Sequence, residues 1–86
     1  MNYTYILKSK RDSKLYVGST TNLRKRFWQH ANGKSSYTKS RGPFALIYYE
    51  ACVDEGDARS REKYLKSGRG KRFIKDRLKR FLFRTG

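Results

Sequence analysis

Two stretches near the N-terminus decide the fold of this chain: Tyr3-Thr4-Tyr5-Ile6-Leu7-Lys8 and, after a polar break, Leu15-Tyr16-Val17-Gly18. In the first stretch Tyr3, Tyr5 and Leu7 share one face, which is the period-two pattern of a β-strand. The second stretch is another short β-rich run, and the polar residues between the two are typical of a turn. We therefore predict that the chain opens with a β-hairpin.

Hydrophobic periodicity predicts four further elements in the rest of the chain. They are a helix over Leu23–Ala31, a strand over Phe44–Tyr49, a helix over Glu55–Lys66 and a helix over Lys71–Phe83. The apolar run of the strand predicts burial on both faces. The polar side chains before the first two helices can cap them. The order β-β-α-β-α-α predicts the α+β class, with a small three-stranded antiparallel sheet covered by three helices in a single domain over residues 1–86.

Charge is the strongest feature of the composition. Lys and Arg total 22 against 7 acidic residues, a formal net charge of +15. An excess of this size in a small aromatic-rich chain favours a nucleic-acid partner, because each phosphate neutralised by Lys or Arg releases condensed counterions. A basic surface that serves only solubility, or attraction to anionic lipid, is the alternative. Charge alone does not tell whether the protein cuts what it binds.

Other compositional features exclude several classes of protein. No stretch approaches the roughly 18 consecutive apolar residues of a membrane helix, and no apolar signal-peptide core follows the N-terminus. The one cysteine, Cys52, has no partner for an internal disulfide or a thiol metal site, so we expect a small core residue. We expect a soluble, cytoplasmic protein, without a membrane partner and monomeric.

Two polar residues lie on the apolar side of the first predicted helix. At about 100° per residue, Leu23, Phe27 and Ala31 form its apolar stripe. Arg26 and His30 flank this stripe one turn apart, so their side chains cover the same patch. A single histidine near a core is usually only a packing residue. An arginine that never loses its charge shares this face, however, and the pair therefore favours a functional site.

Glu62 stands inside the apolar stripe of the second predicted helix, between Ala58 and Leu65. An ionised carboxylate removed from water without partners costs several kcal/mol. It must therefore meet Arg26, another basic residue or a bound metal ion. A buried Glu–Arg ion pair is the structural alternative to a metal site. Because we identify no other carboxylate on an inward face, a one-carboxylate site that leaves Mg²⁺ mostly hydrated is chemically sensible.

Two tyrosines of the hairpin, Tyr5 and Tyr16, can come close together on paired strands. A tyrosine in a strand is by default a packing residue. Beside an arginine, a histidine and a glutamate, a phenol can have its pKa lowered by nearby cations and so accept a proton from water.

These segments resemble the GIY-YIG nuclease superfamily. Tyr3-Thr4-Tyr5 stands where the family has Gly-Ile-Tyr, and Tyr16-Val17-Gly18 where it has Tyr-Ile-Gly. The segment Asn22–His30 matches the one that bears the family's arginine and a histidine one turn later, and Ala58–Lys66 matches the helix with the metal-binding glutamate. The loop 36–39 is similar to that of short stand-alone bacterial members, which are often described as similar to the nuclease domain of the excision-repair incision subunit. Two departures are Tyr3 in place of the first glycine and the lack of an asparagine after the glutamate.

The resemblance implies hydrolysis of DNA, with structured or damaged DNA in repair or recombination as the substrate and a single Mg²⁺ or Mn²⁺ ion. Glu62 would bind the metal, a tyrosine would deprotonate water, Arg26 would stabilise charge on the phosphate and His30 would help to activate the tyrosine or the water. The catalytic set is Tyr5, Tyr16, Arg26, His30 and Glu62, and the substrate-binding set is Lys34, Tyr37, Lys39 and Arg41, assisted by the basic third helix. The alternatives are a basic nucleic-acid-binding module that keeps the fold without cutting, and an RNA-associated structural protein.

Overall fold

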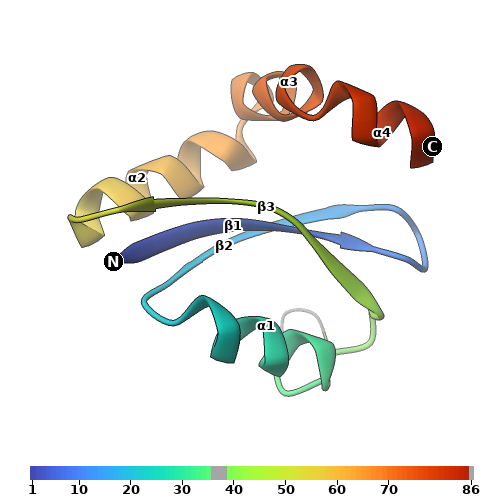
Figure 1. Cartoon of the computed structure of the whole chain (residues 1–86), viewed down its shortest axis with the longest axis horizontal. Coiled ribbons are helices and arrows are strands. Elements are labelled where there is room, and N and C mark those ends of the chain that lie inside the picture. Colours follow the sequence, from blue (N-terminus) through green and yellow to red (C-terminus); the bar gives the residue numbers. More distant parts are fainter. Residues whose placement is uncertain (36–38, 86) are drawn as a thin grey trace.

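The computed structural model describes residues 1–35 and 39–85. Three antiparallel strands form one sheet in the order β2-β1-β3, with β1 (Asn2–Ser9) between β2 (Leu15–Thr20) and β3 (Phe44–Cys52) (Figure 1). The predicted hairpin is confirmed as the β1–β2 pair. The α+β class and the three-stranded antiparallel sheet are confirmed as well.

Helices cover both faces of the sheet. Helix α1 (Leu23–Ala31) lies against one face, and α2 (Glu55–Lys66), α3 (Gly68–Arg77) and α4 (Lys79–Thr85) lie on the other (Figure 1). Each face therefore has its own apolar core. The core on the α1 face contains Tyr5, Leu7, Tyr16 and Phe44, and the core on the α2 and α3 face contains Ile6, Val17, Leu65 and Ile74.

Side-chain caps begin the helices where the sequence predicted them. The Asn22 side chain accepts a hydrogen bond from the Lys25 backbone N–H at 3.1 Å, and Asp54 accepts one from the Asp57 N–H at 3.0 Å. Each bond satisfies an N–H group that has no partner within its own helix. These caps fix the start of α1 and α2, the two helices that carry the candidate site residues.

The prediction that the third strand is buried on both faces is wrong. β3 is an edge strand, and Tyr49 is 54% exposed. The fully covered strand is β1, the central one, whose residues Thr4 to Leu7 are all buried. Cys52, at the end of β3, is only half-buried and its Sγ donates to the Asp54 carbonyl at 3.4 Å, so it is not the core residue we expected.

The prediction of a single third helix over Lys71–Phe83 is also wrong. Helix α3 begins at Gly68, because the Ser67 hydroxyl accepts a hydrogen bond from the Gly70 N–H at 3.2 Å and caps the helix. It ends before Leu78, and a separate helix, α4, follows that residue. Gly70, in the first turn of α3, allows close packing against α2, since a Cβ there would overlap the backbone of Tyr64 and Leu65. None of the described helices is long and apolar enough to cross a membrane.

Candidate active site

A cavity of about 140 Å³ opens beside strand β2, where α1 approaches from one face of the sheet and α2 from the other. All five residues of the predicted catalytic set contribute to its wall. The lining residues are Tyr5, Tyr16, Val17, Gly18, Ser19, Arg26, His30, Glu62 and Lys66. Arg26, His30 and Glu62 therefore lie in the wall of one cavity together with both tyrosines, and their catalytic roles stay predictions.

Tyr5 and His30 line this cavity and contact each other. The Tyr5 hydroxyl and His30 Nε2 are 2.8 Å apart, and both side chains are buried. Tyr5 lies opposite Gly18 in the hairpin, and its ring passes beneath that residue so closely that a Cβ on Gly18 would overlap the phenol. Because Gly18 has no side chain, the Tyr5 ring can occupy the space beside it and reach His30.

Burial keeps both members of this pair neutral. It lowers the pKa of His30 to about 4, with the positive charge of Arg26 acting in the same direction. Burial also raises the pKa of Tyr5 above its usual value, and the hydrogen bonding and charge of Arg26 oppose this only in part. The expected lowering of the pKa by nearby cations is therefore wrong for Tyr5, because desolvation outweighs the cation.

Arg26 is half-buried and projects from α1 toward the cavity. Its guanidinium donates to Gln29 Oε1 at 3.0 Å and to Ser35 Oγ at 3.3 Å. Both of these partners are neutral, so the ion pair between Arg26 and Glu62 that the sequence left open does not form among the described residues. Ala31, placed in the apolar stripe of this helix, is exposed in its last turn.

Glu62 faces the cavity from α2 with its side chain 23% exposed. One carboxylate oxygen accepts from the Ser19 hydroxyl at 2.6 Å, and the other accepts from Lys66 Nζ at 2.8 Å. Burial by itself would raise the pKa of this carboxyl, but the hydrogen bonds from Lys66 and Ser19 outweigh it and lower the pKa. The cation that compensates Glu62 is therefore the lysine one turn away.

This donor set fits a hydrated divalent cation rather than a fully protein-bound one. The described residues contain no group of three or more His, Cys, Asp or Glu side chains that could enclose a metal ion. Mg²⁺ commonly keeps several waters and takes one or two carboxylates plus substrate phosphates. Glu62 offers one anionic ligand at the cavity wall, and Lys66, 47% exposed, can exchange its ion pair for solvent or phosphate.

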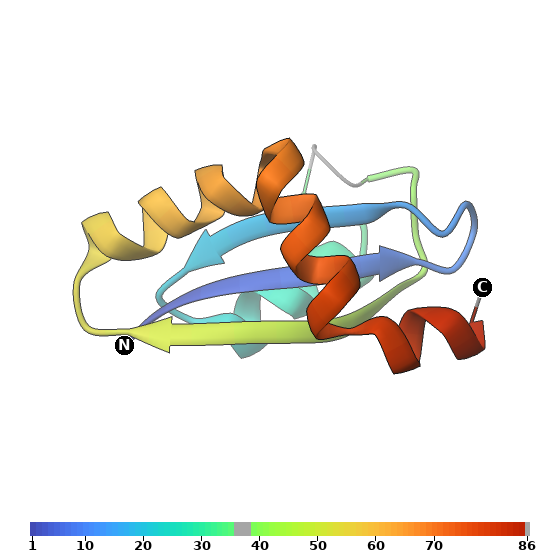
Figure 2. The same cartoon turned by 90° about the horizontal axis from the view of Figure 1, so that it is seen from above.

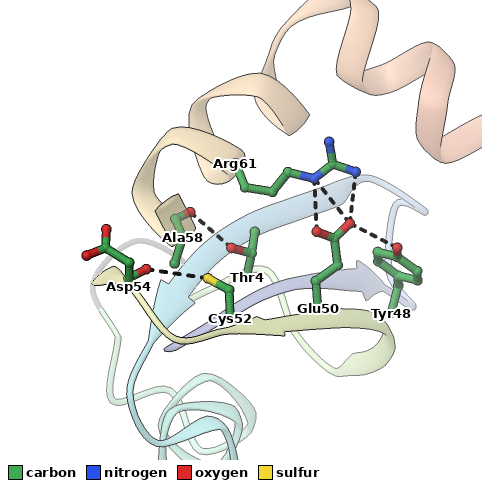
Figure 3. A network of polar contacts seen from close by, with 7 residues as sticks. All are labelled: Thr4, Tyr48, Glu50, Cys52, Asp54, Ala58 and Arg61. Atoms are coloured by element: carbon green, nitrogen blue, oxygen red, sulfur yellow. Dashed lines mark hydrogen bonds and ion pairs between the residues drawn. The ribbon is translucent and has the colours of Figure 1, made fainter. Parts of the chain in front are cut away.

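A second polar network holds α2 against the sheet, and sequence reasoning missed it (Figure 3). Arg61 Nε and Nη2 donate to the two carboxylate oxygens of Glu50 on β3 at 2.9 and 3.0 Å, and the Tyr48 hydroxyl donates to Glu50 at 2.9 Å. The guanidinium also lies over the rings of Tyr64 and Phe73, at 5.0 and 4.6 Å from their centroids.

The sequence predicts that Glu62 is the one carboxylate on an inward face, and Glu50 shows that this prediction is wrong. Its side chain points toward α2 because it follows Tyr48 by two residues on β3, and this period-two placement was the available signal. Burial would raise the pKa of this carboxyl, but the hydrogen bonds from Arg61 and Tyr48 outweigh burial and lower it. Thr4 adds a hydrogen bond to the Ala58 carbonyl at 3.0 Å. Together these contacts fix α2, and with it Glu62, relative to β1.

The predicted substrate-binding residues lie elsewhere. Lys34, Lys39 and Arg41 are exposed and do not line the cavity. Tyr37 lies outside the described residues. The role of this loop in binding substrate therefore stays a prediction.

Comparison with known proteins agrees with this geometry. The family model of the GIY-YIG catalytic domain matches residues 1–77. The chain therefore belongs to the GIY-YIG family, a superfamily of nucleases that act on nucleic acids and generally use divalent metals.

Within this family the chain is similar to bacterial proteins named UPF0213. It is 51% identical over 67 residues to the UPF0213 protein of Clostridium perfringens, covering 77% of this chain and 71% of the relative. It is 39% identical over 66 residues to that of Oceanobacillus iheyensis, covering 76% of each. The solution NMR structure of the UPF0213 protein from Bacillus halodurans matches with a TM-score of 0.53 and 40% identity, covering 86% of this chain and 82% of that one.

Proposed function

We propose that this protein is an endonuclease that depends on a divalent metal ion, Mg²⁺ or Mn²⁺, and hydrolyses phosphodiester bonds in DNA. One observation carries the proposal: Tyr5, Tyr16, Arg26, His30 and Glu62 converge on one cavity from four different elements. A module that only binds DNA gains nothing from a carboxylate facing phosphate, since the two negative charges repel. Within this reading we assign the substrate to structured or damaged DNA, in repair or recombination.

Glu62 would bind the metal ion, which when bound supplies a Lewis acid for the scissile phosphate and the leaving oxygen. Before substrate arrives, Lys66 and Ser19 keep the carboxylate ionised and oriented toward the cavity. The Arg61–Glu50 pair is a positioning contact, because it fixes the helix on which Glu62 stands.

Tyr5 and His30 would move the proton of the attacking water. As the water oxygen bonds to phosphorus, its proton passes to the Tyr5 oxygen while the proton of Tyr5 passes to His30 Nε2. This transfer needs a neutral imidazole, which the pKa of about 4 provides near neutral pH, in the tautomer that carries its hydrogen on Nδ1 and accepts at Nε2. Tyr16, buried in the same wall, would orient the water.

Arg26 would stabilise the negative charge that develops on the phosphate oxygens. Its guanidinium stays charged at every relevant pH, and its planar fork suits phosphate geometry. The ester bond to the leaving oxygen then breaks, and that oxygen takes a proton from solvent. The neutral bonding partners of Arg26 support this role, because the cation is not already neutralised by a described carboxylate.

The test of this proposal is the substitution Glu62→Gln, which keeps the side-chain volume and removes the charge. We expect metal-dependent cleavage to be abolished and DNA binding to stay intact or become slightly stronger, since a negative charge facing phosphate is lost. The fold should lose no more than about 1 kcal/mol, because the broken pair with Lys66 is half-exposed.

Glu55→Gln is the matched control for this test. Glu55 stands on the same helix and forms an i,i+4 pair with Arg59, but it does not line the cavity. This variant should cut DNA like the wild type. Cleavage by Glu62→Gln at the wild-type rate, with Mg²⁺ or Mn²⁺ present, would refute the metal-binding role. Binding without any cleavage by the wild type would favour the second candidate function, a non-catalytic nucleic-acid-binding module.

A further inference from the structure

Two more hollows adjoin the candidate active site on its α3 side. The first lies between strand β2 and α3 and shares Val17 and Lys66 with the catalytic cavity. The second lies between the end of the β1–β2 hairpin and α4, and shares Leu15 and Lys75 with the first. Because neighbouring hollows share lining residues, the three hollows lie in a row along the molecule. Figure 2 shows the hairpin end extending past α3 toward α4.

Beyond the cavity, every charged side chain that lines these two hollows is a lysine. We call the two hollows together the lysine groove, and its six lysines are Lys8, Lys14, Lys66, Lys71, Lys75 and Lys79. Lys8 lies on β1, Lys14 lies in the turn before β2, and the other four come from α2, α3 and α4. No described carboxylate lines either of the two hollows, whereas the hollow beside the start of α2 is lined by both Glu55 and Arg59. The groove is therefore complementary to a polyanion.

The floor between these lysines is apolar. The hollow of about 530 Å³ beside α3 ends on the core residues Val17, Leu65 and Ile74, which are already buried. The apolar side chains that remain accessible lie in the outer hollow: Leu15 and Leu82 are half-buried, and Phe83 is 90% exposed. Duplex DNA presents phosphates outward and keeps its bases stacked inside, so it would use the lysines and leave these apolar side chains uncovered. A single strand exposes its sugars and base faces and can cover apolar and aromatic side chains. Lysine ammonium groups then contact the backbone without reading sequence.

We propose that the lysine groove binds a single-stranded segment of DNA that continues from the phosphate in the catalytic cavity. Lys66 stands at the junction, because it lines both hollows and its Nζ contacts Glu62. This inference rests on the proposed function and specifies its substrate: DNA with a single-stranded tail or gap beside the cut phosphate.

The test compares two double variants in binding assays. Lys71→Gln with Lys75→Gln removes two charges from the groove, and Lys25→Gln with Lys63→Gln removes two exposed lysines that line none of these hollows. Each pair is placed in the Glu62→Gln background to prevent cleavage during the measurement. The probes are fluorescent duplexes of equal length, either blunt or carrying a single-stranded thymidine tail, followed by anisotropy at several salt concentrations.

We expect the tailed duplex to bind at least tenfold more tightly than the blunt duplex before either double substitution. The groove pair should remove most of this preference and reduce the salt slope for the tailed probe by about 1.4, from two lost single-strand phosphate contacts. The control pair should preserve the preference, and melting temperatures should show that all variants are folded. Phe83→Ser should weaken binding of the tailed probe several-fold and leave the blunt probe unaffected.

Three results would overturn the inference. The first is equal affinity for the tailed and the blunt duplex, and the second is that the control pair weakens binding of both probes as much as the groove pair does. The third is tighter binding of poly-glutamate than of the tailed duplex. None of these depends on cleavage. Failure of the proposed function appears in a different experiment, the loss or absence of cleavage by the wild type.

Discussion

His30 should make the stability of this protein depend on pH in a defined direction. Its folded pKa is lowered from 6.5 to about 4 by burial and by the charge of Arg26. When the pH falls below 6.5, the unfolded state binds a proton at this residue while the folded state does not. The contribution of His30 to the free energy of unfolding is therefore fully present above pH 6.5. It decreases as the pH falls, and the decrease levels off near the folded pKa of about 4.

The size of the effect follows from the two pKa values. At about pH 5 the unfolded histidine is almost fully protonated and the folded one is mostly neutral, whereas at about pH 7 both are neutral. While the folded histidine stays neutral, each pH unit below 6.5 lowers the free energy of unfolding by about 1.36 kcal/mol, so acidification to about pH 5 should cost about 2 kcal/mol because of His30 alone.

Urea unfolding of the wild type and of His30→Gln at the two pH values isolates this contribution. Glutamine cannot titrate, but its amide can still reach the Tyr5 hydroxyl. Contributions from the carboxylates are common to both proteins and cancel in the comparison. The wild type should therefore lose about 2 kcal/mol more than the variant on acidification. Parallel losses in the two proteins would show that the folded histidine accepts a proton as easily as the unfolded one, and the argument from burial would fail.

Three further predictions concern packing and charge. Gly18→Ala should displace the Tyr5 ring, costing about 1–3 kcal/mol of stability and at least tenfold in cleavage rate, as measured by melting and by a nuclease assay; wild-type rates would contradict the placement of that ring. Gly70→Ala should destabilise the protein strongly because its Cβ would overlap α2 backbone, whereas Gly68→Ala, with open space around it, should melt like the wild type. Duplex DNA should bind with little sequence preference, and its affinity should fall at least tenfold between about 50 and 200 mM salt, given the formal charge of +15; a flat salt dependence would indicate a protein or lipid partner instead.

The amino-acid sequence by itself determined the features that depend on local order. Alternation in the first eighteen residues predicted the hairpin, and the polar side chains of Ser19–Asn22 and of Asp54 predicted where α1 and α2 begin. Helical spacing predicted that Arg26 and His30 share a patch and that Glu62 faces inward, and the cavity brings all three together. These predictions succeeded because side-chain direction in a strand or helix follows from residue number alone.

Only the tertiary structure decided which partners those side chains meet. The exposure of Tyr49 depends on β3 lying at the edge of the sheet, and the close approach of α3 to the backbone of α2 depends on the missing side chain of Gly70. Lys66 is one helical turn from Glu62 in the sequence, but the hydrogen bond from Ser19 and the lack of a pair with Arg26 depend on how β2, α1 and α2 pack. The direction of the Tyr5 pKa shift was decided by burial, which outweighs the nearby cation. Strand order, desolvation and contacts between distant segments arise from packing in three dimensions, and local periodicity carries no information about them.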